Sequence, residues 1–330
     1  MAALTDTQVV VDDTFSAMGN TAHVVIVADD FATADRLVSS AREWTASLES
    51  SWSRFIASSD IYRLNTAGGR AVRISPDTEV LIRHLIAAHE VTEGLFNPFV
   101  LPSLIAAGYG TSMAGDGAPS CSVAAPVAAP SPRDVLLESV DGATWCRLLG
   151  GASLDPGGLG KGLAADIIAE RLVLAGARGA LVSIGGDIRC VGASPDLDGW
   201  RIDIEVLSHP SFGEASIVLR SGAIATSSTH AKRWQGGHHV IDPKTQRPLD
   251  EQRIGALRQA SVIASNAVWA EVFATVSLVA GSPLAGAMIE SRGLAARFET
   301  TGGQPITTPN FAAFNSSSQA SETFERSAAQ

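Results

Sequence analysis

The chain is poor in cysteine. It has three among 330 residues, Cys121, Cys146 and Cys190, and no two of them form a CxxC pair. Scattered cysteines in odd number argue against a disulfide framework and against a cysteine zinc site. They fit a protein of a reducing compartment.

Clustered basic residues and long apolar runs are also missing. The 24 Lys and Arg are scattered and outnumbered by 34 Asp and Glu, which gives a formal net charge of −10. We therefore expect no nucleic-acid partner and no docking on anionic lipid. Without a run of about 18 apolar residues, we expect no membrane insertion. Residues 1–13 lack the basic and apolar regions of a signal peptide, so a cytoplasmic location is expected.

The overall composition, with 45% hydrophobic and 18% charged residues, is that of a globular protein. Strand and helix patterns mix without a regular βαβ order, which favours an α+β fold over a doubly wound sheet. We expect one domain over residues 1–313. Within it, residues 111–133 are rich in Gly, Ala, Ser and Pro and predict a surface loop. Residues 314–330 are polar and predict a disordered tail.

Local patterns place several elements. Apolar spacing predicts a helix over 33–50, and Ser75-Pro76-Asp77 predicts the start of a helix that ends near Gly94. Further helices are expected over 162–175 and to about Val279, the second one capped by Ser265-Asn266. Strands are expected at 23–27, 180–184, 200–206, 216–219 and 261–264.

A glycine-rich turn runs from Leu154 to Gly162 (LDPGGLGKG) and leads directly into a helix. Such a turn lets the backbone approach a ligand, and a helix N-terminus favours an anion, so Lys161 is placed to reach a phosphate. The turn is not a Walker motif, because Gly162 stands where that motif has Ser or Thr. The alternative is a tight loop with a solvated lysine. Gly185 and Gly186, followed by Asp187, indicate a second close approach or a simple turn.

Hydroxyls and histidines gather in Ala225 to His230 (ATSSTH) and in His238 to Thr245 (HHVIDPKT). A zinc site of His230, His238 and His239 is the alternative, disfavoured because no cysteine is near and adjacent strand residues point to opposite faces. One of His238 and His239 is therefore expected to face solvent. The other is a candidate acid, base or phosphate donor.

Glu271 and Thr275 lie four residues apart in an apolar helix, so their oxygens share one face. A carboxylate in such surroundings must be paired or bind a cation, and hard oxygen donors suit Mg²⁺. The alternative is a glutamate at the rim of the domain, with Thr275 bonded to its own helix backbone.

These segments, in this order from about Phe15 to Phe298, resemble the ApbE family, the FAD:protein FMN transferases. The resemblance rests on AMGN at 17–20, WSRF at 52–55, SDIYRLN at 59–65, EGLFNP at 93–98, LDPGGLGKGLAAD at 154–166, SIGGD at 183–187, ATS at 225–227, HVIDPKTQRP at 239–248 and AEVFAT at 270–275. Glu271 and Asn97 stand where the family usually has Asp, Leu163 where it has Tyr, and Ser228 and Gln246 where it has Gly.

The resemblance implies one domain of mixed sheets flanked by helices. It implies FAD binding by Met18, Phe55, Leu95, Phe96, Asn97, Asp155, Lys161 and Ile241. It implies a Mg²⁺ site of the Glu271 and Thr275 side chains with main-chain oxygens near Gly158 and Ala274. Thr226, His239 and Asp242 would lie at the reacting phosphates as catalytic residues.

The implied activity is Mg²⁺-dependent transfer of the FMN moiety of FAD to a Ser or Thr hydroxyl of an acceptor flavoprotein, with release of AMP. The partner would carry a short Ser/Thr target motif. Candidates for the general base are His239, Asp155 and Asp166. Two alternatives remain open: hydrolysis of FAD to FMN and AMP, and FAD binding without catalysis.

Overall fold

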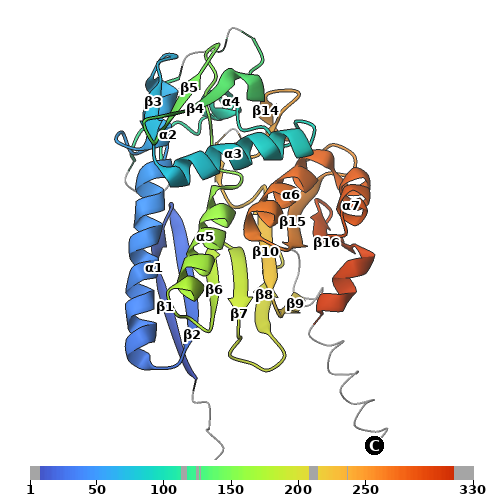
Figure 1. The fold of residues 1–330 in the computed structure, drawn as a ribbon. Helices are drawn as coiled ribbons and strands as arrows, with labels where there is room; N and C mark the ends of the chain where they lie inside the picture. The colour runs from blue at the N-terminus through green and yellow to red at the C-terminus, as the bar shows by residue number, and fades with distance from the viewer. Residues whose placement is uncertain are drawn as a thin grey trace, which may run out of the picture.

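The computed structural model describes residues 8–112, 117–123, 126, 128–207, 215–235 and 237–315. An eight-stranded sheet forms its centre, with neighbouring strands antiparallel in the order β1-β2-β6-β7-β10-β15-β16-β17 (Figure 1). These strands are β1 (Val9–Ala17), β2 (Asn20–Ala28), β6 (Gly179–Ile184), β7 (Asp187–Gly192), β10 (Gly222–Ser228), β15 (Leu257–Ala264), β16 (Ala295–Thr300) and β17 (Pro305–Thr307).

Helices cover one face of this sheet. They are α1 (Phe31–Trp52), α5 (Gly160–Leu174), α6 (Ala267–Ala280) and α7 (Ser282–Ser291). In Figure 1, α5 and α6 lie in front of the strands, and α1 runs along the left edge beside β1. The larger hydrophobic core fills the space between, where Leu37, Ile168 and Phe298 are fully buried. On the other face, β8 (Trp200–Ile204), β9 (Ala215–Leu219) and the 3₁₀ helix η3 (Pro309–Phe314) enclose a second, smaller core.

One end of the main sheet carries the smaller elements. They are α2 (Asp60–Thr66), α3 (Pro76–Val91), α4 (Leu101–Ala106), the 3₁₀ helix η1 (Pro132–Asp134), and a second sheet of β3 (Val72–Ile74), β5 (Ala143–Leu148) and β4 (Val135–Val140). In Figure 1 this group lies at the top, above the helices and the ends of the central strands. Two short strand pairs complete the fold: β11 (Arg233–Trp234) with β12 (Gly237–His238), and β13 (Ile241–Asp242) with β14 (Arg247–Pro248).

The predicted α+β class is confirmed, and so are the predicted helices and their caps. The Ser75 hydroxyl accepts from the Thr78 amide at the start of α3, and the Asn266 side chain caps α6. The predicted strands exist, but β15 is longer than expected and β8 ends at Ile204.

Parts of two predictions lie outside the described residues. These are positions 113–116, 124–125 and 127 of the predicted loop and positions 316–330 of the predicted tail. In the part of the chain that is described, no helix is long and apolar enough to cross a membrane. All three cysteines are buried and free.

Candidate active site

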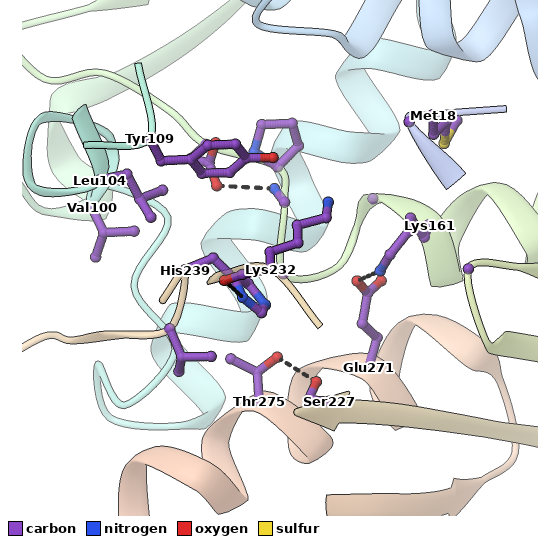
Figure 2. Close-up of a pocket in the computed structure, with 18 of the residues that line it drawn as sticks. Met18, Val100, Leu104, Tyr109, Lys161, Ser227, Lys232, His239, Glu271 and Thr275 are labelled. Carbon is purple, nitrogen blue, oxygen red and sulfur yellow. Dashed lines mark hydrogen bonds and ion pairs between the residues drawn. The ribbon is translucent and has the colours of Figure 1, made fainter. Parts of the chain in front are cut away.

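A cavity of about 330 Å³ opens at the end of the central sheet, beside the first turn of α5 and the middle of α6 (Figure 2). Segments far apart in the sequence form its walls. Of the residues singled out from the sequence, the lining includes Met18, Phe55, Leu95, Phe96, Asn97, Asp155, Gly158, Lys161, Thr226, His239, Ile241, Glu271 and Thr275. A volume of this size is typical of small-molecule sites.

Lys161 joins two carboxylates on one side of this cavity. Its ammonium group donates to Asp187 and to Glu271, and both carboxylates are almost fully buried. Burial opposes the charged form, but the two carboxylates outweigh it and raise the pKa of Lys161. Burial, followed by the charge of Glu271, raises the pKa of Asp187 to about 8, so near neutral pH this carboxyl is largely protonated and the charges of Lys161 and Glu271 balance each other. Glu271 is therefore a paired, buried residue and not a glutamate at the rim of the domain.

The double glycine before Asp187 has a local explanation. Gly185 and Gly186 have φ values of +59° and +92°, in the left-handed region, and they form the turn of the β6–β7 hairpin. This turn places Asp187 at the first position of β7, where it meets Lys161.

Close packing of α5 on α6 explains the glycine after Lys161. A Cβ atom on Gly162 would lie 2.4 Å from the Ala267 carbonyl oxygen. The Gly162 amide donates to the second Glu271 oxygen at 2.8 Å. One turn later, Asp166 accepts from the amides of Ala267 and Val268 at 2.8 and 2.9 Å, and so it caps α6. Asp166 is committed to that cap and is not among the lining residues, which removes it as a candidate base.

Two neighbouring hydroxyls of β10 point to opposite faces of the sheet. The Ser227 hydroxyl bonds to the Thr275 hydroxyl at 3.0 Å, on the side of α6 and the cavity. The Thr226 hydroxyl bonds to the Ser261 hydroxyl at 2.8 Å. The Thr275 hydroxyl is thus hydrogen-bonded to another side chain and not to its own helix backbone.

The oxygen donors on this side of the cavity fit a hard cation. They comprise the Glu271 carboxylate and the hydroxyls of Thr275 and Ser227. Among the described residues, no group of three or more His, Cys, Asp and Glu side chains is arranged to hold a metal. Mg²⁺ does not need such a group, because it commonly binds one or two carboxylates together with substrate phosphates and water.

His239 faces the cavity from the opposite side. Its Nδ1 lies 3.4 Å from the Lys232 carbonyl oxygen. A carbonyl only accepts, so Nδ1 carries the proton and Nε2 keeps its lone pair. Burial, followed by the positive charge of Lys232, lowers the pKa of His239 to about 3. The imidazole is therefore neutral and able to accept a proton from a ligand.

The prediction that one histidine of the pair faces solvent is wrong. His238 is 2% exposed and its Nε2 lies 3.2 Å from the Leu249 carbonyl oxygen. The two side chains do point in opposite directions, but one enters the core and the other the cavity. Exposed His230 bonds to Thr229 and does not line the cavity.

Arg54 organises the outer wall of the cavity. It is 4% exposed, and its Nε lies 3.1 Å from Asp155 Oδ1. Its remaining nitrogens donate to the Ser120 hydroxyl at 2.7 Å and to the Tyr109 carbonyl at 3.1 Å. The guanidinium lies between the rings of Phe55 and Tyr109, 4.3 and 4.4 Å from their centroids. Asp155 is thus held by an ion pair at the cavity wall.

Several lining residues have no local signal in the sequence. Tyr109 stacks on Trp234 at 5.5 Å, and the indole donates to the Ala107 carbonyl. Lys232 also lines the cavity. Conversely, Asp242 and Ala274 do not line it. The Asp242 carboxylate accepts from the Lys244 amide within its own turn.

The chain is similar in sequence to known proteins. The sequence model of the ApbE family matches residues 18–298. The chain is 28% identical over 230 residues to a Vibrio cholerae protein named FAD:protein FMN transferase, a match that covers 67% of this chain and 64% of that relative. It is 27% identical over 293 residues to a Haemophilus influenzae protein of the same name, covering 84% and 83%.

Solved structures share the fold. The apo form of the flavinyl transferase ApbE of Pseudomonas stutzeri superposes with a TM-score of 0.75 at 24% identity, covering 93% of this chain and 97% of that one. The ApbE protein of Thermotoga maritima gives a TM-score of 0.77 at 22% identity, covering 93% and 99%.

Proposed function

This chain belongs to the ApbE family, and on that premise we propose that it is an enzyme, an FAD:protein FMN transferase. In the reaction we propose, a Ser or Thr hydroxyl of an acceptor flavoprotein attacks the FMN-side phosphorus of FAD. A bond forms between that oxygen and phosphorus, the bond to the AMP phosphate breaks, and AMP leaves.

One observation carries the proposal. Asp155, Lys161, His239, Glu271 and Thr275 belong to three separate motifs, yet they line one cavity. The cavity offers a neutral imidazole, a buried carboxylate beside two hydroxyls and an aromatic wall. A flavin nucleotide needs apolar surface for its ring and polar groups for its phosphates, and both are present.

His239 is the base that the geometry supports best. Its unprotonated Nε2 accepts the proton of the acceptor hydroxyl as that oxygen attacks. The hydrogen bond from Nδ1 to the Lys232 carbonyl holds the imidazole in the required tautomer. Asp155 is the weaker candidate, because it is already paired with Arg54. Phosphoryl transfer depends mainly on positioning and on charge neutralisation.

Mg²⁺ is the implied metal, and Glu271 and Thr275 would hold it by side chain. Gly158 and Ala274 would contribute main-chain oxygens, and Thr226 would act near the phosphates. Asp242 does not line the cavity, so it would act there only by holding the adjoining turn. When bound, Mg²⁺ would offset the charge of the pyrophosphate. The buried Glu271 carboxylate, together with the hydroxyls of Thr275 and Ser227 at the cavity, supports cation binding here.

The direct test is incubation of the protein with FAD, Mg²⁺ and a flavoprotein domain that carries a Ser/Thr target motif, followed by intact-mass analysis of that domain. We expect an adduct with the mass of FMN less water, and AMP in equal amount. His239→Ala should lower the rate by about 10²–10⁴-fold. The matched control is His230→Ala, an exposed histidine outside the cavity, which should keep the wild-type rate.

Other outcomes separate the alternatives. Free FMN and AMP without an adduct would indicate hydrolysis, with water in place of the acceptor hydroxyl. Bound FAD that stays intact would indicate a binding protein. Unchanged adduct formation after chelation of Mg²⁺ or in Glu271→Ala would contradict the metal assignment.

A further inference from the structure

The cations of the cavity differ in how they are balanced. Arg54 is paired with Asp155, and Lys161 is paired with Asp187 and Glu271. In contrast, the ammonium group of Lys232 makes no hydrogen bond or ion pair with any residue that the structure describes. Charges of Asp155 and Glu271 reach it only at longer range.

Lys232 is also held away from water. It is half-buried and lines the cavity just after the end of β10. In Figure 2 its side chain extends from beside His239 toward the part of the cavity where Tyr109 lies. Burial lowers the pKa of Lys232, and the charge of Lys161 adds to the effect. A cation in these surroundings lacks a counter-ion, which a bound anion would supply.

We propose that Lys232 binds the pyrophosphate of FAD, beside the base His239. The inference rests on the proposed function, which brings a nucleotide diphosphate into this cavity. Lys161 is poorly suited to the same task alone, because its ammonium group is already shared by two carboxylates. Lys232 is therefore the phosphate contact on the His239 side of the cavity.

Its position also links anion binding to the base. The Lys232 carbonyl receives the His239 Nδ1 proton, while the Lys232 ammonium lowers the pKa of the same imidazole. A diphosphate on Lys232 would offset that charge and make His239 a stronger base once the substrate is bound.

The test compares ligands that differ only in their phosphates. The affinities of FAD, FMN and riboflavin are measured by calorimetry for the wild type, Lys232→Gln and Lys232→Arg. We expect Lys232→Gln to weaken FAD by about ten- to a hundredfold and to leave riboflavin unchanged. Lys232→Arg, which keeps the charge, should restore most of the FAD affinity. Lys244→Gln is the matched control, because Lys244 is exposed and does not line the cavity.

The outcomes are distinguishable. Wild type that binds no FAD would overturn the proposed function, and this inference with it. Equal FAD affinity of the wild type and Lys232→Gln would overturn the role of Lys232 alone. An equal loss of FAD and riboflavin binding in Lys232→Gln would also overturn it, because it would show a structural role in place of a phosphate contact.

Discussion

At the scale of single residues, His239 is defined by the proton that it carries. The hydrogen bond to the Lys232 carbonyl fixes that proton on Nδ1, and the pKa of His239 is lowered to about 3. Protonation of Nε2, which would remove the base, then occurs only as the pH falls through that value. We therefore expect a neutral imidazole with one tautomer between about pH 5 and 8.

Long-range ¹H–¹⁵N spectra of the imidazoles measure this directly, with His239→Asn identifying the signals. The His239 nitrogens should keep the shifts of the Nδ1-protonated form across that range. A midpoint near the ordinary value of about 6.5 would contradict the lowered pKa. Shifts of an Nε2-protonated ring would contradict the hydrogen bond.

A site residue can be predicted from the sequence when it belongs to a short motif, and not when its role depends on contacts between distant segments. Lys161 and Glu271 belong to short motifs, whose residue types and spacing already indicate phosphate and cation chemistry. Arg54 could be predicted only through the WSRF segment that resembles the ApbE family. Tyr109 and Lys232 could not be predicted from the sequence. Their roles depend on contacts such as the Arg54–Tyr109 stack, which join positions 55 residues apart and leave no local pattern.

At the scale of elements, the contact between α5 and α6 depends on one glycine. An alanine at Gly162 would place its Cβ against the Ala267 carbonyl, an atom of the backbone that cannot rotate away. We expect Gly162→Ala to lower the free energy of unfolding by about 2–3 kcal/mol. Gly286→Ala is the matched control, because Gly286 is helical and has open space around its Cβ. It should gain about 0.5–1 kcal/mol.

Urea unfolding provides the measurement. The midpoint should fall for Gly162→Ala and rise for Gly286→Ala, with unchanged slopes. A Gly162→Ala protein as stable as the wild type would show that α5 and α6 can separate at no cost. Since the Gly162 amide bonds to Glu271, such a result would also weaken the account of the cluster.

Caps and spacing explain why the helices were more predictable than the strands. Ser75 and Asn266 each mark the start of a helix, because their side chains accept a hydrogen bond from a backbone amide in its first turn. By contrast, β1 alternates between half-buried and exposed positions, but Asp12, Asp13, Thr14 and Ser16 interrupt its apolar residues, so its sequence does not predict a strand. The sequence of β10 indicates only a cluster of hydroxyls. Its pairing with β15 determines that Thr226 bonds to Ser261, whereas Ser227 bonds to Thr275.

At the scale of the whole molecule, the cavity joins two parts of the chain. The central sheet, α5 and α6 contribute the charged cluster, whereas the small elements at the end of the sheet contribute the aromatic wall. Arg54 is one connection between the two parts. Its guanidinium pairs with Asp155 of the glycine-rich turn, and it donates to the Tyr109 carbonyl and the Ser120 hydroxyl of the outer wall. Its own carbonyl also accepts from the Cys121 amide at 3.1 Å.

Arg54→Lys should therefore loosen one wall and leave the rest of the fold intact. Lysine keeps the charge but cannot make three directed contacts and two ring contacts at once. We expect faster hydrogen exchange at the amides of Ser120 and Cys121, with unchanged exchange in α5, α6 and β15.

Arg83→Lys, at an exposed pair with Glu79 on α3, is the control and should leave both regions unchanged. Faster exchange throughout the protein would show that Arg54 supports the whole core. No change at Ser120 and Cys121 would show that the outer wall is held by other contacts, such as the stack of Tyr109 on Trp234.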